Sequence, residues 1–142
     1  MAHYAFIDSD TYEVVNVITG KDEDDLAGLP AGYSSWEEYY GDINGVLCKR
    51  TSRNTKHGKH LNEDGSLSNT QEKAIRVNYA EIGGTYDPVR DAFICANQVP
   101  GWILNEETLD YEAPVPVPEG FEYPIWNAES EVWENSPPNT EP

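Results

Sequence analysis

The feature that most constrains the fold is a short pattern that occurs four times along the chain. Each copy has a large apolar residue followed directly by Asp or Asn, then a polar stretch, then a second large apolar residue seven positions after the first. The flanking residues are Ile7 and Val14, Tyr86 and Phe93, Leu104 and Tyr111, and Trp126 and Trp133. Asp and Asn side chains accept hydrogen bonds from the backbone two residues ahead and so start turns locally. The repeat therefore predicts four β-hairpins whose flanking apolar residues lie opposite one another.

A single hairpin is marginally stable in water, so several of them must share a buried face. The 142 residues fit one domain, and the ten prolines and eleven glycines indicate many turns and few long helices. We predict a mainly β fold: a single small domain of successive hairpins over residues 1–135, with at most one short helix. A long polar loop at 50–71 and a flexible, proline-rich tail at 136–142 complete the prediction.

The helix is expected near residues 34–40. Ser34 or Ser35 can serve as the N-cap, with Glu38 three or four residues later. At the helical spacings of three and four, Trp36, Tyr39 and Tyr40 then share one face. That face is either core or an aromatic anchor for a partner protein.

Two further segments follow. The stretch RTSRNTKHGKHLNEDGSLSNTQ has no apolar periodicity, which predicts an exposed loop that is either functional or disordered. In KAIRVNYAEI, by contrast, apolar Ile75, Val77 and Tyr79 alternate with polar residues, which predicts a half-buried strand.

The charge is large and unevenly distributed. A formal net charge of −17 argues against nucleic-acid binding, which depends on Lys and Arg neutralising phosphates. No basic residue follows Arg90, whereas five of the nine lie between 49 and 59: Lys49, Arg50, Arg53, Lys56 and Lys59. A cationic spot and an anionic end suit oriented docking on a partner, with Lys49, Arg50 and Arg53 as candidate contacts.

Targeting and redox signals are few. The start, MAHYAFIDSD, lacks a positive region followed by an apolar run, and no stretch approaches the ~20 apolar residues of a membrane span. We therefore expect no membrane association. Cys48 and Cys95 are the only cysteines and are expected to be reduced thiols.

Patterns for site chemistry are weak. Cys48, His57 and His60, with Cys95 or His3, permit a zinc hypothesis, but the paired close ligands of structural zinc sites are missing. The acidic run at 21–32 lacks the alternating ligands of a calcium loop. No nucleophile elbow, phosphate loop or metalloprotease helix occurs, so we expect no catalytic residues and no cofactor. Carbohydrate binding stays open, since Trp102, Trp126 and Trp133 are available as stacking platforms.

Five segments together resemble a family of small proteins of marine tailed bacteriophages, chiefly cyanophages and their relatives. These segments are MAHYAFID, LCKRTSRNTKHGKH, RVNYAEIGGTYDPVRDAFI, WILNEETLDYEAPVPVP and YPIWNAESEVWE. The chain departs from the family pattern at Glu81 to Gly84 and in the acidic insertion NEDGSLSNTQE. The resemblance implies a virion-associated structural protein, with no catalytic residues to transfer.

The function expected from the sequence is a phage virion structural protein, in first place a capsid decoration (cement) subunit docking on the major capsid protein. Its expected partners are then phage structural proteins. Its expected location is the virion, which is assembled in the host cytoplasm. Homo-oligomers on the virion are a further option. Lys49, Arg50 and Arg53 are expected to meet acidic capsid surface while the acidic C-terminal hairpins face solvent. The alternatives are a tail, neck or fibre subunit and a host-glycan-binding module.

Overall fold

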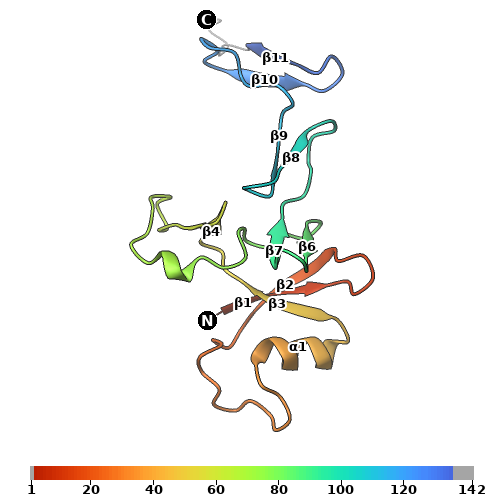
Figure 1. Ribbon diagram of the computed structural model, residues 1–142, viewed down its shortest axis with the longest axis vertical. Helices are drawn as coiled ribbons and strands as arrows, with labels where there is room; N and C mark the ends of the chain where they lie inside the picture. The colour runs from red at the N-terminus through yellow and green to blue at the C-terminus, as the bar shows by residue number, and fades with distance from the viewer. Residues whose placement is uncertain (1, 136–142) are drawn as a thin grey trace, which may run out of the picture.

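The computed structural model describes residues 2–135, so the predicted tail at 136–142 lies outside the described residues. The mainly β fold is confirmed, with one α-helix in the described part of the chain (Figure 1). Strands β1 (Ala2–Ile7), β2 (Val14–Gly20) and β3 (Leu47–Thr51) form an antiparallel sheet in the order β2-β1-β3. The helix α1 spans Trp36–Asn44, and a single 3-10 turn, η1, spans Gln71–Lys73.

The remaining strands pair as separate two-stranded hairpins. They are β4 (Thr55–Lys56) with β5 (Lys59–His60), β6 (Thr85–Asp87) with β7 (Ala92–Ile94), β8 (Ile103–Asn105) with β9 (Asp110–Glu112), and β10 (Pro124–Asn127) with β11 (Val132–Asn135). In Figure 1 the β8–β9 and β10–β11 hairpins extend one after the other away from the three-stranded sheet. We call residues 97–135 the arm.

The four predicted hairpin registers are confirmed. Each pair of flanking apolar residues is a cross-strand pair, from Ile7 with Val14 to Trp126 with Trp133. In every turn the Asp or Asn Oδ1 accepts hydrogen bonds from the backbone N–H groups two and three residues later. A residue with positive φ closes each turn: Tyr12, Asp91, Leu109 or Glu131. One turn geometry therefore occurs four times, which explains the constant spacing of seven.

The core lies on the two faces of the β2-β1-β3 sheet. On one face Ile7, Val14, Tyr86 and Phe93 are the largest members of a buried cluster, which docks the β6–β7 hairpin on the sheet. On the other face Tyr4 and Cys48 pack against α1. The alternation of side chains along β1 produces this division, since Tyr4 faces one side and the neighbouring Ala5 faces the other.

The helix begins as predicted and continues to Asn44. The Ser35 hydroxyl accepts a hydrogen bond from the Glu38 N–H at 3.1 Å, which caps the first turn. Gly41 lets the helix approach β3, since a Cβ there would lie 2.8 Å from the Val46 carbonyl oxygen. Gly45, at φ 66°, then ends the helix in the left-handed conformation.

Replacing Ser35 by Ala is expected to lower the free energy of unfolding by about 1 kcal/mol, because the Glu38 N–H loses its acceptor. Urea denaturation followed by circular dichroism measures this change. Ser130→Ala in the β10–β11 turn is the control, because only the backbone N–H of Ser130 makes a described hydrogen bond there. An equal loss in both variants would contradict the capping role of Ser35.

The strand predicted at 73–82 is wrong. Residues 74–80 form no strand, and Arg76 and Val77 have φ values of 52° and 69°. Backbone hydrogen bonds to their carbonyls hold this conformation: Gly58 N–H donates to Val77 at 2.7 Å and Phe93 N–H to Arg76 at 3.0 Å. Tertiary contacts therefore override the alternating pattern, because the segment joins several elements instead of pairing along one of them.

The predicted long loop at 50–71 is largely irregular, with the small β4–β5 hairpin in its middle. It is anchored to the body rather than detached, because Thr51, Thr55 and Ser68 are buried. The hydroxyls of Thr51 and Thr55 accept hydrogen bonds from the backbone of Ala80 and Ile75, respectively. Within the described residues no helix has the length and apolar character needed to cross a bilayer.

Candidate functional site

The three basic residues predicted as partner contacts do not form one patch. Lys49 and Arg50 are neighbours on β3, so their side chains point to opposite faces of the sheet. The Lys49 ammonium lies 5.9 Å from the centre of the Tyr86 ring. On the opposite face lies the helix, whose Glu37 accepts the Arg50 backbone N–H at 2.6 Å. Arg53 lies beyond the end of β3 and is the one exposed residue of the three, whereas Lys49 and Arg50 are half-buried.

The predicted aromatic face of the helix lies toward the sheet. Trp36 is 5% exposed, stacks on Tyr40 and donates its indole N–H to the Asp25 carbonyl at 2.7 Å. Tyr39 and Tyr40 are half-buried beside it and pack against the same cluster. These three rings hold α1 on the sheet, which favours the core interpretation over a partner anchor.

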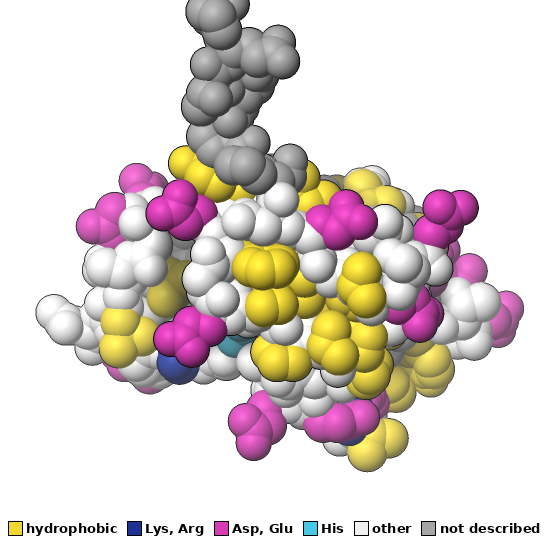
Figure 2. Space-filling model, turned by 90° about the horizontal axis from the view of Figure 1, so that it is seen from above, with side chains coloured by type: hydrophobic (Ala, Val, Ile, Leu, Met, Phe, Trp, Pro, Cys, Tyr) yellow, Lys and Arg dark blue, Asp and Glu magenta, His cyan; other side chains and the backbone are white. Residues whose placement is uncertain are grey.

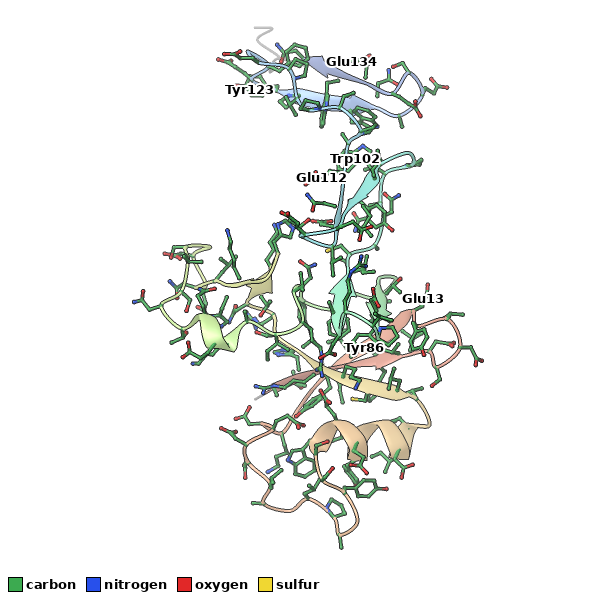
Figure 3. All side chains as sticks on the ribbon, viewed as in Figure 1. Glu13, Tyr86, Trp102, Glu112, Tyr123 and Glu134 are labelled. Carbon is green, nitrogen blue, oxygen red and sulfur yellow. The ribbon has the colours of Figure 1, made fainter. Side chains whose placement is uncertain are left out.

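The β10–β11 hairpin at the end of the arm has two different faces. Trp126 and Trp133 form a cross-strand pair with ring centres 5.3 Å apart. Both lie against Trp102, at 6.2 and 6.3 Å, and Trp133 donates its indole N–H to the Val115 carbonyl. Figure 3 shows Trp102 between the two arm hairpins. This tryptophan cluster therefore joins β10–β11 to the rest of the arm.

The outer side of the same hairpin carries exposed apolar side chains. Ile125 and Val132 follow the opposite alternation to the two tryptophans and are 52% and 45% exposed. Tyr123, directly before β10, is 44% exposed. We call Tyr123, Ile125 and Val132 the tip face.

The tip face is surrounded by negative charge. Between residues 97 and 135 the chain has nine acidic residues and no basic one. Figure 2 looks down on this end of the molecule and shows hydrophobic side chains gathered near the centre, with Asp and Glu around them. An apolar centre with a charged rim is the usual anatomy of a protein-binding surface.

A hollow lies at the base of the arm. It has a volume of about 500 Å³ and is bordered by the polar loop, by the segment around Tyr79 and by the β8–β9 hairpin. Arg53 and Lys56 contribute cations, and Trp102 and Tyr111 contribute aromatic rings. We call this hollow the basal cleft.

Asp110 organises one wall of the basal cleft. Its Oδ2 lies 3.0 Å from His57 Nε2, which ties the polar loop to the arm. Burial raises the pKa of Asp110, but hydrogen bonds from His57, from the Tyr111 N–H and from the Cys95 thiol outweigh it, so the pKa lies below its ordinary value. The carboxylate is therefore ionised and already engaged at neutral pH.

Neither cysteine is activated for chemistry. Burial, together with Asp110 and Glu81, raises the pKa of Cys95 to about 12. Burial and Glu37 raise the pKa of Cys48, packed under the helix, to about 12 as well. Both thiols are protonated at neutral pH and are poor nucleophiles there.

The ligands of the zinc hypothesis are not assembled. Cys48 lies in the cluster beneath α1, whereas His57 contacts Asp110 at the base of the arm. Among residues 2–135, no group of three or more His, Cys, Asp or Glu side chains is placed to hold a metal ion.

Comparison with known proteins gives no relatives for this arrangement. No family model matches the chain, and no curated protein and no solved structure shows significant similarity to it.

Proposed function

We propose that the protein is a phage virion structural protein, in first place a capsid decoration subunit, and that it attaches to the major capsid protein through the tip face. The observation that carries the attachment is the exposed apolar surface of Tyr123, Ile125 and Val132 at the end of the arm. Its mechanism is adhesive: apolar burial and charge complementarity across a contact, without a chemical step.

The arm buries little apolar surface within itself. Leu109 is the only buried residue between 97 and 135. In a stack of small repeated units, each unit buries the apolar face of its neighbour, and the last unit needs a polar outer face to end the stack. The β10–β11 hairpin ends the stack of described hairpins with an apolar outer face instead. A partner that covers the tip face would complete the stack.

Two unpaired indole groups in the arm support the same interpretation. The indole N–H groups of Trp102 and Trp126 are buried and have no hydrogen-bond partner among the described residues. A buried donor without a partner costs about 1–3 kcal/mol. The tryptophan cluster is therefore not an optimised closed core, which fits an arm that is fully stabilised only in an assembly.

Charge determines which partner suits the tip face. A second copy of the chain would bring two acidic rims together in a molecule of net charge −17, which is unfavourable. A protein with an apolar patch bordered by Lys and Arg is complementary. The proposed orientation thus reverses the one expected from the sequence, because the acidic arm docks and the Arg53 region remains free.

The virion location rests on the resemblance to phage proteins, and copy number tests it. Quantitative mass spectrometry of purified particles, referenced to the major capsid protein, is expected to find hundreds of copies per particle. A few to a few tens would move the protein to the tail, neck or fibres. Absence from the particle would overturn the virion proposal.

Replacing Ile125 and Val132 together by Ser is expected to reduce incorporation by at least about tenfold, or ~1.4 kcal/mol, because the apolar centre of the contact is lost. The measurement is the amount of variant in purified particles relative to a co-produced wild-type chain. Val89→Ser is the matched control, since Val89 is 93% exposed in the β6–β7 turn, away from the tip face. Equal incorporation of the Ile125/Val132 variant and the wild type would show that the tip face is not the docking surface.

A further inference from the structure

Two of the side chains that line the basal cleft, Arg53 and Lys56, are cationic. No ion pair joins Arg53 or Lys56 to a carboxylate among the described residues, whereas Arg76 and Arg90 each pair with two. Both side chains are exposed and both line the cleft. Because both cations border one hollow, they are available together to an anionic ligand that enters it.

Glu81 and Asp110 also line the cleft and keep their negative charges, but protein groups hold both carboxylates in place. Glu81 Oε1 accepts the Ala96 N–H at 2.6 Å. Asp110 accepts hydrogen bonds from His57 and from the Tyr111 N–H. An incoming anion therefore meets Arg53 and Lys56 as exposed donors, whereas Glu81 and Asp110 are held by hydrogen bonds within the protein.

Aromatic side chains also line the cleft. Trp102 and Tyr111 both line the cleft, and Gln98 adds an exposed amide. The volume of about 500 Å³ falls within the range of small-ligand sites and is large enough for more than one sugar ring. Aromatic faces beside hydrogen-bonding side chains suit a pyranose ring, which has an apolar C–H face and a hydroxyl edge.

We propose that the basal cleft binds an acidic saccharide, with a sugar ring against Trp102 or Tyr111 and its carboxylate at Arg53 and Lys56. A neutral sugar would not use the two cations, and an acidic peptide such as polyglutamate has no ring to lie against Trp102 or Tyr111. This site is separate from the tip face and does not depend on the proposed docking there.

The test is a fluorescence titration of the full chain with trigalacturonate, with galactotriose as the neutral control. Because Trp102 lines the cleft, trigalacturonate is expected to give a saturable change in emission that weakens as salt rises. Galactotriose at the same concentrations is expected to give none. The Trp102→Phe variant should lose most of the emission change.

Charge variants identify the site. Arg53→Gln with Lys56→Gln is expected to weaken trigalacturonate binding at least tenfold, and Lys59→Gln is expected to leave it unchanged. Lys59 is the matched control, an exposed cation of the same loop that does not line the cleft. The absence of saturable binding, equal binding of galactotriose, or equal loss in the Lys59 variant would overturn the proposal. Competition by hexaglutamate at equal affinity would also overturn it, because the cleft would then be a peptide site.

Discussion

Replacing Asn78 by Ala is expected to lower the free energy of unfolding by about 3 kcal/mol or more. Asn78 is 2% exposed, and its Oδ1 accepts the His57 N–H at 2.9 Å. Its amide nitrogen donates to the Phe93 carbonyl at 3.2 Å and to the Thr108 carbonyl at 2.7 Å. One side chain thus connects the polar loop, β7 and the β8–β9 turn. Its removal leaves buried backbone groups without partners, and urea denaturation followed by tryptophan fluorescence measures the loss.

The control for this variant is Asn62→Ala. Asn62 is exposed, and its side-chain amide donates only to Ser66 and Leu67 within its own loop. A change within about 0.5 kcal/mol is expected there. A loss for Asn78→Ala no larger than that of Asn62→Ala would show that Asn78 does not connect these elements.

Asn78 also links stability to the proposed docking. The Thr108 carbonyl that it binds belongs to the turn at the base of the arm. Hydrogen exchange in residues 103–112 is therefore expected to accelerate in the Asn78 variant more than exchange in β1. The tip face itself is unchanged, so any loss of incorporation in this variant would come from a loosened arm.

The hairpins could be predicted from the sequence because their determinants are local. Asp8, Asp87, Asn105 and Asn127 each bind the backbone within their own turn, at two and three residues' distance. The spacing of seven residues then sets the register without reference to the rest of the molecule. The same holds for the helix start, which the Ser35 side chain determines within one turn.

The segment 73–82 could not be predicted this way. Its alternation of Ile75, Val77 and Tyr79 is typical of a strand, yet Val77 has a φ of 69°, which is unusual for a β-branched residue. Residues distant in sequence hold the segment in this conformation. The Gly58 N–H donates to the Val77 carbonyl, and the Tyr79 N–H donates to the Thr55 carbonyl. Such contacts leave no trace in a local pattern.

The docking surface expected from the sequence, at Lys49, Arg50 and Arg53, differs from the tip face for another reason. Lys49, Arg50 and Arg53 are close in sequence, but strand alternation on β3 places Lys49 and Arg50 on opposite faces. That separation follows directly from the strand conformation of Leu47–Thr51. The tip face also had a signal, since pairing Trp126 with Trp133 places Ile125 and Val132 on the other side of the hairpin.

Replacing Arg76 by Met is expected to cost about 3–5 kcal/mol of folding free energy. The Arg76 side chain is 17% exposed, and its guanidinium lies 2.7 Å from Glu37 Oε2 and 2.7 Å from Asp91 Oδ1. It also donates to the Arg50 carbonyl at 2.8 Å. It therefore fastens the helix, β3 and the β6–β7 turn together. Its loss leaves Glu37 as a largely buried, unpaired carboxylate.

A double variant tests whether the stability lost in Arg76→Met comes from leaving the Glu37 carboxylate unpaired. Arg76→Met with Glu37→Met is expected to recover part of the stability lost in Arg76→Met alone, because the unpaired charge is then removed. Recovery is only partial, since Glu37 also accepts the Arg50 N–H. If the two single losses simply add, measured by urea denaturation at neutral pH, Arg76 and Glu37 do not act as a pair.

The dependence of stability on pH gives a second check on Arg76. Burial raises the pKa of Asp91, but hydrogen bonds from Tyr86 and Arg76 outweigh it, so the pKa in the folded protein lies below its ordinary value. A lowered folded-state pKa stabilises the protein above the unfolded pKa of about 4, and this contribution is lost as pH falls through the folded value. Removing Arg76 raises the folded pKa toward the unfolded one. The fall in urea midpoint between pH 5 and pH 3 should therefore be shallower in Arg76→Met than in the wild type, and an unchanged slope would exclude Arg76 as a partner of Asp91.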